Sequence, residues 1–354
     1  SIFISCIMHL FSILLDFSID MGGQYDTVST TKNTTQTNTT EVNEMLKAQR
    51  FRVEVEMTGI SRRTAGRIVA EMLHVTASNP DSTVYETIKI KDLKGRTWKV
   101  MRDSSITPIR NDGTDEHLDQ YRVEFVTPPL NYDDIRLLQS IIRKLRESGA
   151  KSHSSCGIHV HVDGSNHTPT SIVKLVNFMI ARQDLIYSSL EIGDRASHWC
   201  KKLNSKLLQA MKKNPNLSKD DLEKIWYSEA NDGYSSGINH SHYNNTRYHG
   251  VNLHAFFSKG TIEFRLFNST LHAGKIKAYI QLCLALSAWS ITSKDKLIFR
   301  SMTDYTPAKK VTIMRNILLR RLGLTGEEFE TCRHHLMAPL KKAAGMNTRD
   351  SEAA

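Results

Sequence analysis

Alternation of apolar and polar residues marks three segments of this chain as β-strands, at 51–57, 155–163 and 261–267. In a strand, successive side chains point to opposite faces of the sheet, so residues two positions apart share a face. Each segment therefore puts charged or imidazole side chains on one face and aliphatic or aromatic ones on the other. The polar set comprises Glu54, Glu56, His159, His161, Asp163, Glu263 and Arg265. If the three strands lie in one sheet, these side chains form the floor of a single site.

The rest of the pattern predicts further strands mixed with amphipathic helices. A Lys-Gly turn joins strands at 83–91 and 97–102, and a Pro-Pro pair closes another at 122–127. Apolar residues at three-four spacing predict a helix over 133–148, with Gly149 as its stop. Further helices are expected at 62–73, 170–191, 274–292, 308–322 and 326–340. Because β-α-β alternation is not strict, the predicted fold class is α+β, with a mostly antiparallel sheet backed by helices.

The expected catalytic domain spans residues 50–292. A basic, largely helical insertion interrupts it at about 195–249 and ends in a loop rich in Gly, Asn, His and Ser. Helices at 293–340 and a flexible tail at 341–354 follow the domain.

The N-terminal part divides into an apolar and a polar segment. Residues 1–20 are largely apolar but contain His9, Asp16 and several serines, which makes them short and polar for a membrane span. They also lack the positive start of a secretory signal. We expect the native start at Met21 and regard residues 1–20 as upstream sequence, with a membrane anchor as the less favoured alternative. Residues 21–49, rich in Thr, Asn, Gln and Ser, are expected to be a disordered leader.

Composition indicates a globular protein with a basic surface. Hydrophobic residues make up 40% and charged residues 24% of the chain, and the formal net charge is +10. This excess fits either an anionic partner or a solvated basic surface. The five cysteines are scattered and form no CxxC pair, so neither a disulfide framework nor a thiolate metal site is indicated. A cytoplasmic location fits best.

The polar side chains of the strands suit a hard cation. Glu124 lies within an apolar strand and Asp103 ends the strand at 97–102, which adds carboxylates to those of the three alternating segments. Many oxygen ligands favour Mg²⁺ or Mn²⁺, whereas Zn²⁺ would prefer more nitrogen or sulfur. Taken singly, Glu-x-Glu is also common on a surface edge strand, and Glu263 with Arg265 also fits a lateral ion pair. Cys156 beside a histidine is a further, weaker candidate for a catalytic thiol, and no Gly-rich phosphate loop occurs.

In their order along the chain, these segments resemble the amidoligase family of the glutamine synthetase-like carboxylate–amine ligase superfamily. The resemblance covers roughly residues 50–290. It is carried by VEVE at 53–56, DS at 103–104, EFVTPPL at 124–130, GA at 149–150 leading to SCGIHVH at 155–161, Arg247 followed by VNL at 251–253, and TIEFRLFNST at 261–270. The CGIHVH and TIEFRLFNST segments are the most specific.

The resemblance implies a sheet that forms a half-open funnel, with ATP entering at one end and metal ions on the inner face. It implies an ATP-dependent carboxylate–amine ligase that forms an amide through an acyl phosphate. The implied metal ligands are Glu54, Glu56, Glu124, His161 and Glu263. Arg265 and Arg247 are expected to stabilise the charge that develops on the transferred phosphoryl group. His159, Arg247, Asn252 and Asp103 are expected to contact nucleotide or substrate, and the insertion to shape the acceptor site.

Two other functions stay open at this point. A zinc hydrolase that uses the HxH strand would need more ligands, which His240, His242 and His249 could supply, and about eight βα units. A non-catalytic nucleic-acid-binding protein would place Lys, Arg and aromatic residues on one exposed face. The motifs here project acids instead, so nucleic acid is not the expected partner. The resemblance implies a small-molecule or peptide carboxylate and an amine as substrates, and a membrane is not expected unless residues 1–20 are native.

Overall fold

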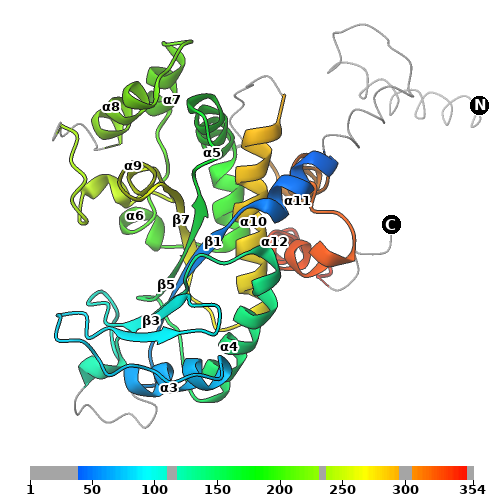
Figure 1. The fold of residues 1–354 in the computed structure, drawn as a ribbon. Helices are drawn as coiled ribbons and strands as arrows, with labels where there is room; N and C mark the ends of the chain where they lie inside the picture. Colours follow the sequence, from blue (N-terminus) through cyan, green and yellow to red (C-terminus); the bar gives the residue numbers. More distant parts are fainter. Residues whose placement is uncertain (1–38, 110–117, 231–236, 295–304, 349–354) are drawn as a thin grey trace, which may run out of the picture. The chain divides into compact units, whose positions relative to one another are not determined.

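A single antiparallel sheet organises the residues that the computed structural model describes, which are 39–109, 118–230, 237–294 and 305–348. Its strands follow the order β2-β3-β4-β1-β5-β7-β6, and each neighbouring pair runs antiparallel (Figure 1). The strands are β1 (Phe51–Met57), β2 (Ile88–Lys91), β3 (Thr97–Met101), β4 (Val123–Val126), β5 (Gly157–Asp163), β6 (Val251–Asn252) and β7 (Thr261–Asn268). The α+β prediction is confirmed.

Helices connect and cover these strands. The α-helices are α3 (Arg62–Met72), α4 (Ile135–Glu147), α5 (Pro169–Leu190), α6 (Arg195–His198), α7 (Ser205–Lys212), α8 (Lys219–Glu229), α9 (His254–Lys259), α10 (Ala273–Thr292), α11 (Pro307–Asn316) and α12 (Glu330–Ala343). Short 3₁₀ or π turns are η1 (Leu118–Tyr121), η2 (Tyr132–Asp134), η3 (Asn245–Arg247), η4 (Ile317–Arg321) and η5 (Glu327–Phe329).

The apolar face of the sheet carries the core. Helix α3 packs on β2, β3 and β4, whereas α10 contacts β5 and α5 contacts β7; α12 in turn packs against α10 and α5 (Figure 1). The inward side chains of β1 and β5, such as Val53, Val55 and Val160, are fully buried in this core. Helix α10 is apolar around most of its circumference, which is typical of a helix enclosed on all sides. The opposite face of the sheet is therefore free to hold polar side chains.

Strand β7 carries an irregularity next to β5. Ile158 pairs with Phe267 and Val160 pairs with Phe264, so β7 has one residue more than β5 over this interval. Beyond the bulge, Phe267 lies in the core and stacks on Tyr279 of α10 with ring centroids 4.3 Å apart.

The strand predicted over 83–91 is wrong for its first half. Only β2 is extended, because the Asp81 side chain accepts hydrogen bonds from the backbone N–H groups of Thr83 and Thr87 and closes a turn. Glu86 has a left-handed φ of 45° in that turn. The stop at Gly149 is confirmed, since its φ of 97° ends α4.

The predicted ends of the chain need correction. Residues 39–48, assigned to a disordered leader, are helical, because Val42 and Leu46 bury completely in the core. The predicted tail from 341 also begins inside α12, where Lys341 is buried. Residues 1–38 and 349–354, including the apolar segment 1–20, lie outside the described residues. Within the described ranges, none of the helices has both the length and the apolar character needed to cross a bilayer.

Candidate functional site

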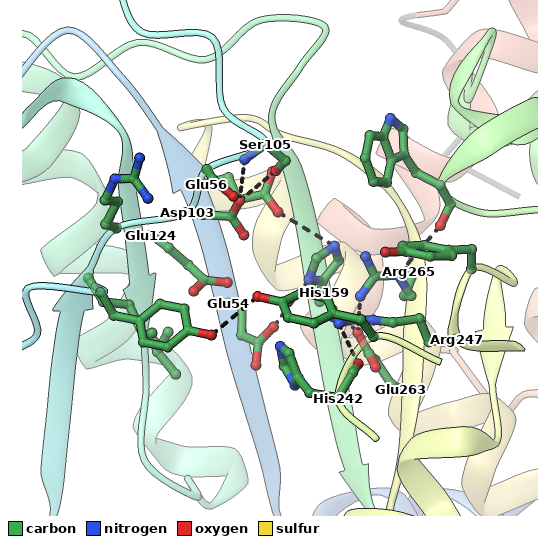
Figure 2. Close-up of a pocket in the computed structure, with 18 of the residues that line it drawn as sticks. Glu54, Glu56, Asp103, Ser105, Glu124, His159, His242, Arg247, Glu263 and Arg265 are labelled. Atoms are coloured by element: carbon green, nitrogen blue, oxygen red, sulfur yellow. Dashed lines mark hydrogen bonds and ion pairs between the residues drawn. The ribbon is translucent and has the colours of Figure 1, made fainter. Parts of the chain in front are cut away.

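The polar face of four adjacent strands forms the floor of a pocket. We use "floor" for the side chains that β1, β4, β5 and β7 present on the face away from the core, together with Asp103, which follows β3. The sheet register places Glu54 opposite His159, Glu56 opposite Glu124, and His161 opposite Glu263. Residues from four strands therefore converge, and the carboxylates point toward a shared space (Figure 2).

Metal-ligand side chains on this floor form three linked groups. In each group, one ligand atom per residue lies within 4.8 Å of the others. The groups are Glu54, His161 and Glu263; Glu54, Glu124 and His159; and Glu56, Asp103 and Glu124. The structure thus brings together all five residues expected to hold metal. Asp103, which was expected to contact nucleotide or substrate, lies with these carboxylates, where its Oδ1 accepts hydrogen bonds from Ser105 N–H and Oγ–H.

Each of the two histidines directs its Nε2 atom into the carboxylate cluster. His159 Nδ1 lies 3.2 Å from Glu54 Oε2, and His161 Nδ1 lies 3.1 Å from Thr261 Oγ1. Both Nε2 atoms are buried beside carboxylates: that of His161 lies 3.2 Å from Glu54 Oε1 and that of His159 lies 3.7 Å from Glu56 Oε1, and neither makes a hydrogen bond of regular geometry with a described residue. Burial, and then the charge of Arg265, lowers the pKa of His159 to about 4, so this imidazole is neutral at pH 7. A buried neutral imidazole with a free nitrogen beside carboxylates fits a metal ligand.

The carboxylates divide into two with raised pKa values and two with lowered ones. Burial, followed by Asp103, raises the pKa of Glu56 to about 7. Burial and the nearby Glu54 raise the pKa of Glu124 well above its usual range. The carboxyl groups of Glu54, Glu56, Asp103 and Glu124 lie so close together that they cannot all ionise without a counter-charge.

Glu54 and Glu263 behave in the opposite way. Burial opposes their ionisation, but His161 and His159 hold the pKa of Glu54 well below its usual range. Arg265, together with both histidines, does the same for the pKa of Glu263. A divalent cation among the acids would supply the counter-charge that Glu56 and Glu124 lack.

Arg265 and Asn252 both hold Glu263. Arg265 Nη1 donates to Glu263 Oε1 at 2.6 Å, and Asn252 Nδ2 donates to Oε2 at 2.6 Å. Arg265 is buried, lies 5.8 Å from the Tyr248 ring centroid and lines the pocket. Asn252, expected to bind the cofactor, instead lines a smaller cavity of about 150 Å³ beside Glu263, and its buried Oδ1 has no hydrogen-bond partner among the described residues.

The main cavity has a volume of about 590 Å³, and one side of it comes from the segment 195–259. We call the lining residues of this segment the wall: Arg195, Trp199, His242, Tyr243, Arg247, Tyr248 and Lys259. Arg247 donates to the His242 carbonyl at 2.8 Å and lies over the Tyr243 and Tyr248 rings. Apart from Arg247, and His242 as a candidate ligand in the zinc-hydrolase alternative, these residues were assigned no role from the sequence, and their only signal was the basic composition of the insertion.

Other cations line the cavity from the β1, β2 and β3 side, namely Arg52, Lys99 and Arg102. Tyr85, which precedes β2, also lines it and places its hydroxyl 3.2 Å from that of Tyr243. Because β2 and β6 are opposite edge strands, this contact joins segments next to the two edges of the sheet. The cavity therefore combines clustered acids with cations and aromatic rings.

The zinc-hydrolase hypothesis and the hypothesis of a catalytic Cys156 thiol do not fit this arrangement. The described strands are all antiparallel, so the βα barrel required by the zinc-hydrolase hypothesis is not formed. His240 bonds to Glu223 and His249 Nδ1 bonds to the Thr246 carbonyl, away from the carboxylate groups. Cys156 is fully buried and burial raises the pKa of its thiol, which disfavours a thiolate nucleophile.

Comparisons with known proteins bear on this site. A family model described as "Putative amidoligase enzyme" matches residues 47–287, which include all the floor residues. No curated protein matches the chain. Among solved structures, the chain is similar to a bifunctional glutathione synthetase from Pasteurella multocida, with 14% identity and a TM-score of 0.36. That match covers 87% of this chain and 50% of the other, so this chain spans half the length of that enzyme.

Proposed function

This chain belongs to the amidoligase family, and on that premise we propose that it is an ATP-dependent carboxylate–amine ligase that works with Mg²⁺ or Mn²⁺. Family membership supports a carbon–nitrogen ligase in general terms. The use of ATP, the metal and the acyl-phosphate route are the specific content of the proposal. We also infer that the floor is the inner face of a half-open funnel that ATP enters at one end.

One observation carries the proposal: three linked groups of carboxylate and imidazole ligands share a cavity with several Arg and Lys side chains. Oxygen-rich ligand groups suit Mg²⁺, and guanidinium groups suit phosphate oxygens. Mg-ATP presents both kinds of charge to a protein at the same time. A pocket built for a neutral ligand would need neither set.

The reaction divides into two substitutions. An oxygen of the substrate carboxylate attacks the γ-phosphorus of ATP, and the bond from phosphorus to the bridging oxygen of ADP breaks. The amine nitrogen then attacks the acyl carbon, phosphate leaves with its oxygen, and the nitrogen loses a proton. Such phosphoryl transfer needs positioning and charge stabilisation more than a protein nucleophile.

The residues of the chain take the following roles in this scheme. Glu54, Glu56, Glu124, Glu263 and His161 would hold the divalent ions, which when bound neutralise phosphate charge. His159 and Asp103 complete two of the ligand groups. Arg265 and Arg247 would face the phosphoryl oxygens as their charge develops. The wall would select the amine and the carboxylate.

The test is an assay of ADP and phosphate release with a panel of carboxylates and amines. Wild-type protein should release ADP only when ATP, Mg²⁺ and a matching substrate pair are all present. Glu263→Gln should lower kcat/KM by roughly 10²-fold or more, since it removes a charged ligand and frees Arg265. Asp184→Asn, which alters an exposed ion pair with Lys202, is the matched control and should leave turnover unchanged. Turnover that ignores ATP and requires Zn²⁺ would contradict the proposal in favour of a hydrolase.

A further inference from the structure

Arg195 is a buried cation without a protein partner. It begins α6, is 8% exposed and lines the main cavity. Its Nε is buried with no acceptor, and no described residue forms a hydrogen bond or ion pair with its guanidinium. Arg265, which is also buried at 4% exposed, has Glu263 at 2.6 Å. Two arginines of one pocket thus differ: Arg265 is paired with a carboxylate, whereas Arg195 has no partner among the described residues.

Gly157 makes room for this guanidinium. A Cβ at Gly157 would lie 2.3 Å from Nη2 and 3.0 Å from Cζ of Arg195, so any other residue would displace the side chain. The Gly157 N–H donates to Glu56 Oε2 at 2.6 Å, which fixes the backbone at the start of β5. The guanidinium therefore rests on a defined stretch of backbone, two residues before His159, and its position is built into the fold.

An unpaired buried charge is costly, and proteins keep one where a ligand supplies the opposite charge. The charge of Arg195 acts to lower the pKa of Glu56, yet no described carboxylate lies within 4.0 Å of the guanidinium. The smaller cavity beside Glu263 shares His242, Arg247 and Lys259 with the main one but does not include Arg195. Arg195 thus marks a separate position within the pocket, toward Glu56.

We propose that Arg195, resting on Gly157, forms an oxyanion subsite that binds a carboxylate or a phosphoryl group in the pocket. The planar fork of a guanidinium matches two oxygens of either group. The choice between these two sources rests on the proposed ligase function, in which the pocket would bind both a carboxylate substrate and ATP. The existence of the subsite does not depend on that function.

The experiment measures anion binding by the full chain without ATP or metal. Inorganic phosphate and acetate are titrated separately by calorimetry in the presence of EDTA. Arg195→Met should weaken binding of at least one anion by about tenfold or more, and Arg195→Lys should weaken it less. Gly157→Ala keeps the charge but displaces the guanidinium, so it should weaken the same anion. Arg67→Met, an exposed arginine of α3 paired with Glu71, is the matched control and should bind as wild type.

The outcomes separate the two sources. Loss of phosphate binding alone assigns the subsite to a phosphoryl group, and loss of acetate binding alone assigns it to the carboxylate substrate. If Arg195→Met, shown to be folded by circular dichroism, binds both anions as wild type does, or if wild type binds neither, the subsite is refuted. Since turnover is not measured, an inactive enzyme with an Arg195-dependent anion site would contradict the ligase proposal and leave this inference intact.

Discussion

The floor and the wall of the pocket hold their charged groups in different ways. On the floor, Glu54 lies against two histidines, and Glu263 is held by Arg265 and Asn252. On the wall, the only hydrogen bond of the Arg247 side chain to a described residue goes to a backbone carbonyl, and the guanidinium lies over tyrosine rings. The floor is thus preorganised by its own contacts, whereas the wall leaves positive charge available. This difference suits a site whose floor holds cations and whose wall meets an anionic ligand.

The largest expected effect is the difference in the free energy of unfolding between a variant of a paired arginine and a variant of an unpaired one. Arg265→Met should lower the free energy of unfolding by about 3–5 kcal/mol, because it leaves Glu263 charged and buried without its cation. Arg195→Met should leave the free energy of unfolding unchanged or raise it, because no described residue depends on that guanidinium. Urea denaturation of both variants checks this. Equal losses in the two variants would show that floor and wall do not differ in this respect.

The next effect concerns Glu56 and pH. Its folded-state pKa of about 7 lies above the ordinary value of 4.5, so the folded protein keeps a proton that the unfolded chain releases. The stabilisation from protonated Glu56 is complete below about pH 4.5 and is lost as pH rises through about 7. Relative to Glu56→Gln, the free energy of unfolding of the wild type should therefore fall by about 3 kcal/mol over that range.

Urea denaturation in EDTA at several pH values measures this difference between the two proteins. Comparison with Glu56→Gln is needed because buried histidines with lowered pKa values, such as His159, change stability in the opposite direction over part of the range. Glu71→Gln on the exposed face of α3 is the control. A difference that stays flat with pH would show that Glu56 is ionised throughout.

A third effect ranks the floor acids by the number of ligand groups they join. Glu54 belongs to two of the three groups and Asp103 to one. Glu54→Gln should therefore weaken Mn²⁺ binding by about 10–100-fold, and Asp103→Asn by less. Electron paramagnetic resonance of free Mn²⁺ measures both affinities. Arg247→Met on the wall should leave Mn²⁺ affinity nearly unchanged, and a loss equal to that of Glu54→Gln would remove the distinction between floor and wall.

The smallest effect is expected for the tyrosine contact across the pocket. Tyr85→Phe removes one hydroxyl from the 3.2 Å pair with Tyr243. Stability should change by no more than about 1 kcal/mol, and KM by a few-fold, because Tyr85 is 37% and Tyr243 64% exposed, so water can replace the lost contact. Thermal unfolding and steady-state kinetics test this, with Tyr243→Phe as the matched variant. A large fall in kcat would mean that the pair takes part in the chemistry.

The floor could be predicted from the sequence because strand periodicity fixes which side chains share a face. Alternation alone grouped Glu54, Glu56, His159, His161 and Glu263, and the register then brought them together. Asp163, predicted in the same set, pairs with Arg50 instead and does not line the pocket. Asp103 was assigned to nucleotide or substrate, and because it follows a strand, periodicity did not indicate the direction of its side chain. Its place beside Glu56 and Glu124 depends on the turn at Ser105.

The wall could not be predicted in this way. Arg195 begins a four-residue helix, and Tyr243 lies in a loop, so no repeating pattern links them to the strands. Tyr85 was placed in a strand that Asp81 in fact converts into a turn. The nearest signal for Arg195 was Gly157 at the start of β5, which has meaning only once the two segments are seen in contact.

The bulge in β7 limits how this protein can change in length. Loss of one residue from the bulge would leave both pairings in place and make the ladder regular, but since strand side chains alternate with a period of two, gain of one residue there would shift part of the strand by one position. If the β5 pairing of Ile262 and Phe264 were kept, Phe267 would lose its place beside Tyr279. If the pairing beyond the bulge were kept, Glu263 and Arg265 would turn into the core. Insertions are therefore better tolerated in the loops around residue 240 than in these eight residues.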